Sequence, residues 1–143
     1  MELKSVTASV YFSSDVANPD TTSKFYADLQ MFAVLMRQPD PGEFMRQFVS
    51  WEIASKVNKW EGRNVTRWRN DEYDQAYLAA EGELDPVKRA ALIIKMNDLV
   101  VGDRAVIPIV NRQWAAAMSF RLRASLSGWD DDFWNLKDWH REA

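Results

Sequence analysis

The segment from Asp85 to Gly102 carries the clearest folding signals in this 143-residue chain. Asp85 is a good helix cap, Pro86 suits the first helical position, and Gly102 is a typical helix terminator. Between them, apolar residues recur at spacings of three and four, which predicts an amphipathic helix. Its apolar face is expected to combine Val87, Ala91 and Ile94 with Leu92, Met96 and Leu99. Such a helix must bury that face against other elements.

Two more helices are predicted upstream. Asp40 is placed to cap the first, with Pro41 at its first position, and an aromatic stripe at i, i+4 and i+7 forms its buried face: Phe44, Phe48 and Trp51. Asn70 is a plausible cap for the second, which ends at Gly82. Its buried face is expected to hold Tyr73, Ala76, Tyr77 and Ala80. The polar stretch 58–64 between the two helices is predicted to be a loop.

Three segments have the patterns of β-strands. Apolar and polar residues alternate over 5–12 and again over 25–31, with a turn-rich connection between them. A short apolar run follows at 105–110, where Pro108 favours an edge strand or a hinge. The expected fold class is therefore α/β, with a few-stranded mixed sheet and three or so helices.

Composition removes several function classes. The chain has no cysteine and a single histidine, His140, near its end. Thiolate metal sites and cysteine nucleophiles are therefore excluded, and a Ser-His-Asp triad would have to be built on the tail. The net charge of −3 argues against a nucleic-acid partner. No apolar run approaches the length of a membrane span, and the N-terminus does not have the pattern of a signal peptide. No cofactor and no catalytic residue is predicted.

Tryptophan is over-represented, with seven in 143 residues. Because the indole N–H needs a partner when it is buried, this surplus suits stacking platforms and interfaces better than an ordinary core. Four of the seven lie in the tail after Val110, which shows only weak periodicity.

An ordered series of short motifs gives the chain a family resemblance. The series consists of Asp40-Pro41 before an aromatic helix ending at Ser50, Asn58, Gly62-Arg63-Asn64, Arg67-Trp68-Arg69-Asn70-Asp71-Glu72-Tyr73-Asp74, Glu83-Leu84-Asp85-Pro86-Val87-Lys88-Arg89 and Val106-Ile107-Pro108-Ile109. In this order and spacing the chain resembles the family 5 extracytoplasmic solute-binding proteins of ABC transporters, which include peptide-, opine- and nickel-binding members.

The resemblance implies a C-terminal portion of a two-lobed, type II-like periplasmic binding protein. Residues 1–110 would belong to the second lobe, and residues 111–143 would form the hinge crossover and a tail that packs on the first lobe. Hinge positions would be Ile109, Asn111 and Gln113. The implied function is non-enzymatic: binding a peptide or peptide-like solute by lobe closure, in the periplasm, for an ABC permease.

Candidate ligand-binding residues follow from the same resemblance, each beside a structural alternative. Arg37 stands near the position where peptide-binding members carry a carboxylate for the ligand's ammonium, so an anionic or opine-like solute is conceivable; it could equally be a solvated loop residue. Asp28 could face the cleft or solvent. Arg67 and Trp68 could clamp a ligand's carboxylate and apolar part, or Trp68 could simply anchor a loop.

Two further features keep alternatives open. The run Asp130-Asp131-Asp132 suggests a cation site, but a solvated acidic turn is the favoured interpretation, and no metal is predicted. The aromatic tail supports a second hypothesis for the whole chain, a stand-alone interaction or structural protein that self-associates through its tryptophan-rich tail.

Overall fold

The computed structural model describes residues 2–15, 17–24, 26–36, 38–111, 115–128 and 133–142. The chain divides into two compact units. Unit 1 consists of Met1–Phe32 and Gly42–Ile107, and unit 2 consists of Ala33–Pro41 and Pro108–Ala143. The described residues combine helices with a small two-stranded antiparallel sheet, so the chain mixes α and β elements.

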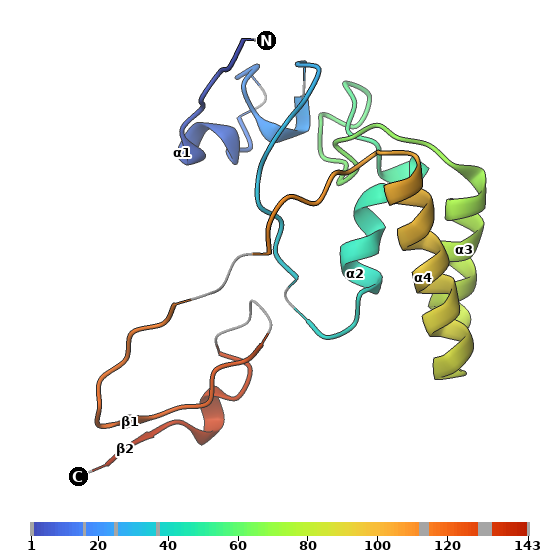
Figure 1. The fold of residues 1–143 in the computed structure, drawn as a ribbon. Helices are drawn as coiled ribbons and strands as arrows, with labels where there is room; N and C mark the ends of the chain where they lie inside the picture. The colour runs from blue at the N-terminus through green and yellow to red at the C-terminus, as the bar shows by residue number, and fades with distance from the viewer. Residues whose placement is uncertain are drawn as a thin grey trace. The chain divides into compact units, whose positions relative to one another are not determined.

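Unit 1 is built on helices. Its elements are α1 (Ala8–Tyr11), the 3₁₀ turn Thr22–Lys24, α2 (Gly42–Met45), the 3₁₀ turns Arg46–Phe48 and Ser50–Glu52, α3 (Asp71–Gly82) and α4 (Pro86–Gly102). The long helices α3 and α4 lie side by side, with α2 near them (Figure 1). The buried core lies among these three helices and the turn after α2.

The predicted caps of the two long helices are confirmed. The Asn70 side chain accepts a hydrogen bond from the Tyr73 amide at the start of α3. Asp85 does the same at α4 for the amides of Val87 and Lys88. These bonds satisfy N–H groups that the first turn of a helix leaves without partners. The predicted ends at Gly82 and Gly102 are also correct.

The core of unit 1 confirms the predicted buried face of α3. Tyr73, Ala76, Tyr77 and Ala80 are all buried. They belong to a single apolar cluster whose other buried members are Met45, Phe48, Val49, Met96 and Val100. The aromatic stripe predicted upstream is right only in part: Phe48 is buried, whereas Trp51 is 51% exposed. The helix there ends at Met45 and continues as 3₁₀ turns, which moves Trp51 off the buried side.

The predicted apolar face of α4 is wrong in one half. Met96 is buried, and Leu92 and Leu99 pack against the core, but Val87 is 76% exposed and Ile94 is 61% exposed. Positions 87 and 94 lie about 160–180° around the helix from Met96, at 100° per residue. The sequence pattern therefore contains two opposite apolar stripes, and only one of them packs on unit 1.

The three predicted strands are absent from the described residues. Part of the first, 8–11, is helix α1, where the Val10 and Tyr11 amides donate to the Thr7 carbonyl. The described residues of the other two, 26–31 and 105–110, belong to no helix or strand. A strand needs a neighbouring edge for its backbone groups, and alternation along one segment does not supply that neighbour.

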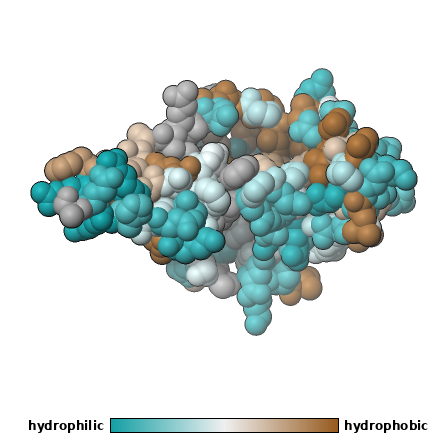
Figure 2. Space-filling view, turned by 90° about the horizontal axis from the view of Figure 1, so that it is seen from below, coloured by the Kyte–Doolittle hydropathy of each residue, from teal (hydrophilic) through white to brown (hydrophobic). Residues whose placement is uncertain are grey.

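Unit 2 contains the only sheet in the described part of the chain. Strand β1 (Leu122–Arg123) pairs antiparallel with β2 (His140–Arg141), and the 3₁₀ turn Leu136–Asp138 precedes β2. No strand was predicted at either place. Not one of the described residues of unit 2 is buried. The face drawn in Figure 2 shows apolar side chains scattered among polar ones.

None of the helices in the described ranges has both the length and the apolarity needed to cross a lipid bilayer.

Candidate functional site

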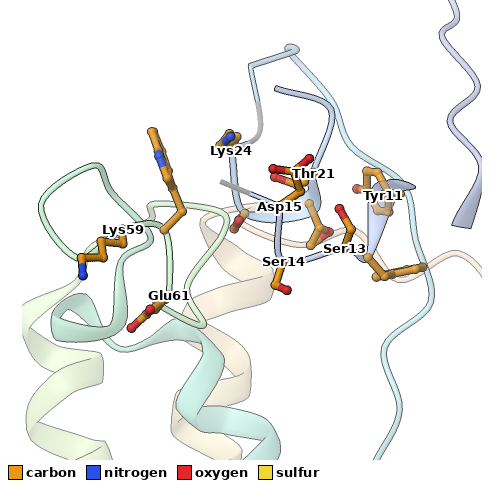
Figure 3. Close-up of a pocket in the computed structure, with 12 residues that line it drawn as sticks. Tyr11, Ser13, Ser14, Asp15, Thr21, Lys24, Lys59 and Glu61 are labelled. Carbon is orange, nitrogen blue, oxygen red and sulfur yellow. The ribbon is translucent and has the colours of Figure 1, made fainter. Parts of the chain in front are cut away.

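A cavity of about 310 Å³ in unit 1 is the candidate binding site. One wall is the N-terminal segment, residues 11–15 and 21–24, and the other is the turn Lys59–Glu61 (Figure 3). Its volume is at the lower end of the range for small-molecule pockets. The Lys59 side chain points away from the N-terminal wall in Figure 3, and Trp60 and Glu61 line the cavity from the same turn.

The N-terminal wall carries hydroxyl groups that the fold does not satisfy. The hydroxyl oxygens of Tyr11, Ser13 and Thr22 are buried, and none makes a well-aligned hydrogen bond within the described residues. Burial raises the pKa of Tyr11, and the nearby side chains of Thr22 and Gln30 partly oppose that rise. Buried polar groups are rarely left without partners. These three oxygens are closed to solvent, so they lie behind the cavity surface and do not themselves contact a ligand in this structure.

The charges around the cavity are balanced. Lys24 and Lys59 stand against Asp15 and Glu61 among the lining residues. Two of these groups also hold the N-terminal segment together: Lys24 Nζ donates to the Asn18 carbonyl at 2.6 Å, and Asp15 Oδ1 accepts from the Ala17 amide at 2.8 Å. An uncharged or zwitterionic solute therefore matches this site better than a strongly charged one.

Trp60 is held in a strained but well-supported turn. Lys59 and Trp60 have φ values of 54° and 67°, in the left-handed region that non-glycine residues rarely adopt. The Trp60 amide donates to the Ser55 carbonyl at 2.8 Å, and Asn58 bridges the turn by accepting from the Ser55 amide and donating to the Ile53 carbonyl. Strain of this kind persists only where the surroundings enforce it.

The base of this turn is fixed by Gly62 and Asn64. A Cβ atom at position 62 would collide with the Glu52 carbonyl oxygen and would lie 2.7 Å from the Ala54 nitrogen. Because both are backbone atoms, glycine is required there. Asn64 is fully buried, and its side-chain amide donates to the carbonyls of Phe48, Val49 and Trp68 at 3.0–3.2 Å. The turn that presents Trp60 is thus anchored directly to the helical core.

Arg67, a predicted binding residue, lies beside the cavity. Its guanidinium carbon is 5.7 Å from the centre of the Trp60 ring, within cation–π range, and Nη2 donates to the Ser23 carbonyl at 3.4 Å. Its φ of 57° is also left-handed. Arg67 therefore connects the two walls of the cavity, and the ring that it contacts is Trp60.

Trp68 lies against the core and not in the cavity wall. Its ring meets Tyr73 edge to face at 5.1 Å, and its indole N–H donates to the Asp103 carboxylate at 3.1 Å. Asp28 is exposed, and it does not line the cavity. Of the predicted hinge residues, Ile109 and Asn111 are exposed.

Arg37 and Gln113 lie outside the described residues, as does the acidic run Asp130-Asp131-Asp132. In the part of the chain that the structure describes, no group of three or more histidine, cysteine, aspartate or glutamate side chains is placed to hold a metal ion. The residues that the sequence analysis did not select are Trp60 and the hydroxyl wall. A tryptophan inside the polar 58–64 loop was the one visible signal for them.

Comparisons of the chain with protein-family models, with curated proteins and with solved structures find no match.

Proposed function

We propose that this chain is a non-catalytic solute-binding module, the C-terminal part of a family 5-like substrate-binding protein that serves an ABC importer. Two lines support the proposal. The ordered motif series resembles that family, and the cavity beside Trp60 and Arg67 suits a small peptide-like or opine-like solute. The single observation that carries the binding function is the contact between the Arg67 guanidinium and the Trp60 ring beside the cavity.

The proposed mechanism needs two walls to close on one solute. The cavity of unit 1, in the second lobe, supplies one binding surface, and the first lobe implied by the resemblance supplies the other, so that solute contacts favour the closed state. A single open surface offers few contacts. We therefore expect the chain alone to bind weakly, with a Kd of about 1 mM or higher, equivalent to no more than about −4 kcal/mol.

Fluorine NMR of the chain labelled with 5-fluorotryptophan tests the site. Trp60→Phe assigns the Trp60 resonance, and Trp51→Phe assigns a surface tryptophan outside the cavity as the matched control. Zwitterionic dipeptides and opines, added to about 20 mM, are expected to shift the Trp60 signal in a saturable way and leave Trp51 unchanged. Arg67→Ala should weaken the response by releasing the stacked ring.

Three outcomes decide between parts of the proposal. Equal shifts at Trp60 and Trp51, or no shift at Trp60 with any solute of the panel, would remove the cavity as the binding site. Micromolar binding by the isolated chain would show a complete site and contradict the two-lobed mechanism. The importer assignment has its own test: the reading frame upstream of Met1 should encode the first lobe and an export signal, and an in-frame stop codon directly upstream would refute it.

A second candidate function is favoured by a different observation. Large apolar side chains in unit 2 are exposed, among them Phe120 (83%), Phe133 (64%) and Trp134 (57%), and a hollow of about 250 Å³ there has a mainly apolar lining. The chain would then be a stand-alone module that self-associates through its tail. Light scattering of Phe133→Ser tests this candidate, because loss of a dimer on that substitution would support it.

A further inference from the structure

The N-terminal part of unit 1, residues 1–32, adds no described residue to the buried apolar core. We call this part the strap. The buried members of the core cluster begin at Met45. Among the described residues of the strap, Thr21 alone is buried, and its side chain is polar. Burial of apolar surface is the main stabilising contribution in folding, so the strap lacks the interaction that stabilises the helices of unit 1.

The strap is held together by contacts of its own. The Lys4 ammonium donates to the Asp20 carboxylate and to the Tyr26 hydroxyl, both at 2.7 Å, and that hydroxyl donates to Asp20 at 2.7 Å. Elsewhere in the strap, the rings of Tyr11 and Phe32 lie with their centres 5.9 Å apart. These contacts join its two ends without using the helical core.

The strap faces the turn Lys59–Glu61 across the cavity of about 310 Å³ (Figure 3). Arg67 reaches across from the side of the turn: its Nη2 donates to the Ser23 carbonyl, and its guanidinium carbon lies 5.7 Å from the centre of the Trp60 ring. The bond to Ser23 is 3.4 Å long, at the weak end of the range for hydrogen bonds. A contact that encloses a cavity gives up the dispersion attraction that close packing would supply.

Buried polar groups inside the strap oppose its folded arrangement. The hydroxyl oxygens of Tyr11, Ser13 and Thr22 are closed to solvent and make no well-aligned hydrogen bond within the described residues. Each of these groups regains hydrogen bonds to water when the strap opens. The balance between the open and the closed strap is therefore expected to be close.

We infer that the strap opens and closes over the cavity while the helices of unit 1 stay folded, and that Arg67 is the latch residue that favours the closed state. Local opening is expected where little apolar surface is buried, and we expect about 1% of the molecules to be open at any moment. The inference rests on the proposed function only for the use of the cavity: one wall of the proposed site exists only while the strap is closed.

Thiol labelling measures this opening, because the chain has no cysteine of its own. Thr21→Cys places a thiol at a buried position of the strap, and Ala76→Cys places one at an equally buried position of α3, each 4% exposed in the unmodified chain. With excess iodoacetamide, Thr21→Cys should react about 100-fold more slowly than free cysteine, and Ala76→Cys at least about 1,000-fold more slowly.

Substitution of Arg67 tests the latch. Arg67→Ala should raise the labelling rate of Thr21→Cys about tenfold, because the hydrogen bond to Ser23 and the contact with Trp60 are lost together. It should leave the rate of Ala76→Cys unchanged. Arg69→Ala, at an exposed arginine two positions along the chain, is the matched control and should change neither rate.

Hydrogen exchange repeats the measurement in the unmodified chain. The Lys24 amide donates to the Thr21 carbonyl at 3.1 Å within the strap, and it should exchange faster than the Tyr77 amide in α3. Equal protection at the two amides, with equal labelling of the two thiols, would show that the strap and the helices unfold together and would overturn the inference. A Lys24 amide that exchanges at the rate of an unfolded peptide would overturn it as well, because the strap would then not close.

The latch has its own contrary results. Faster labelling at both thiols in Arg67→Ala, or no change at Thr21→Cys, would refute the role of Arg67. None of these measurements uses a solute. Their failure is therefore distinct from a failure of the fluorine NMR test of solute binding.

Discussion

At the scale of single residues, Asn64 holds more of this structure together than any other polar side chain in the described ranges. Its backbone pairs with the strand-like segment before it: the Asn64 amide donates to the Glu52 carbonyl at 2.8 Å, and its carbonyl accepts from the Ala54 amide at 3.1 Å. Its side chain donates to three further carbonyls and accepts from the Thr66 hydroxyl. One buried amide thus links the turn that carries Trp60 to the core.

Replacement of this amide should destabilise the protein strongly. Asn64→Ala leaves buried carbonyls without donors, so we expect the free energy of unfolding to fall by about 2–3 kcal/mol. Asn64→Asp keeps the volume but loses the donor, and should cost a similar amount. Urea denaturation measures both, with Asn97→Ala on the exposed side of α4 as the control, expected to change stability by less than ~0.5 kcal/mol. An Asn64→Asp variant as stable as the unmodified chain would contradict the assigned role.

The contact between Arg67 and Trp60 could not be predicted from the sequence. The sequence predicts Arg67 as a binding residue and does not predict Trp60 as its partner. Which ring it meets depends on left-handed backbone at positions 59, 60 and 67, and none of these is a glycine that would announce it. The positions of the buried hydroxyl groups of Tyr11, Ser13 and Thr22 depend on how the N-terminal segment folds beside the turn Lys59–Glu61. The sequence predicts part of that segment to be a strand.

At the scale of elements, α3 and α4 were predictable and the strands were not. Helix signals are local: Asn70 and Asp85 cap amides two or three residues away, and the buried face of α3 follows from spacing alone. Strand signals are incomplete, because alternation defines two faces but not the neighbouring edge. Two apolar stripes of α4 repeat at i, i+4 and i+7: Val87, Ala91 and Ile94, and Leu92, Met96 and Leu99. Spacing alone therefore does not decide which stripe packs on unit 1.

The link between α2 and α3 gives a prediction about alkaline pH. The Tyr73 hydroxyl donates to the Met45 carbonyl at 2.6 Å, and burial, with smaller contributions from Tyr77 and Asp74, holds the pKa of Tyr73 well above its usual range. The folded state therefore keeps this proton when the unfolded chain releases it, near pH 10. Stability is intact below that pH and falls as the pH rises above it.

Tyr73→Phe should change both the level and the slope of this profile. At pH 8 the variant should be about 1 kcal/mol less stable, from the lost hydrogen bond. Between about pH 10 and 11 the free energy of unfolding of the variant should decline less steeply than that of the unmodified chain. The difference in slope should be at most about 1.4 kcal/mol per pH unit, the contribution of one proton. Urea denaturation at pH 8, 10 and 11 measures both effects. Tyr26→Phe, at an exposed tyrosine, is the matched control, and parallel profiles for Tyr73→Phe and the unmodified chain would refute the assignment.

At the scale of the whole molecule, the two units differ in what makes them fold. Every buried member of the core cluster lies between Met45 and Val100, inside unit 1. The described residues of unit 2 include none that is buried, and strands of two residues each cannot stabilise it alone. The apolar side chains of the tail are therefore available to a partner surface, as both candidate functions require.

Truncation separates these two parts. A chain ending at Ile107 should keep its helical circular dichroism signal and unfold cooperatively, with a free energy of unfolding within ~1 kcal/mol of the full chain, because it retains the whole core cluster. A chain ending at Lys95 loses Met96 and Val100 and should not fold, since two buried side chains and the last turns of α4 are removed together. If the Ile107 truncation also fails to fold, the tail supplies core contacts and its apolar surface is not free for a partner. If it folds as expected, hydrogen exchange in the full chain should be fastest across 115–128 and 133–142 and should slow there only when a partner surface is added.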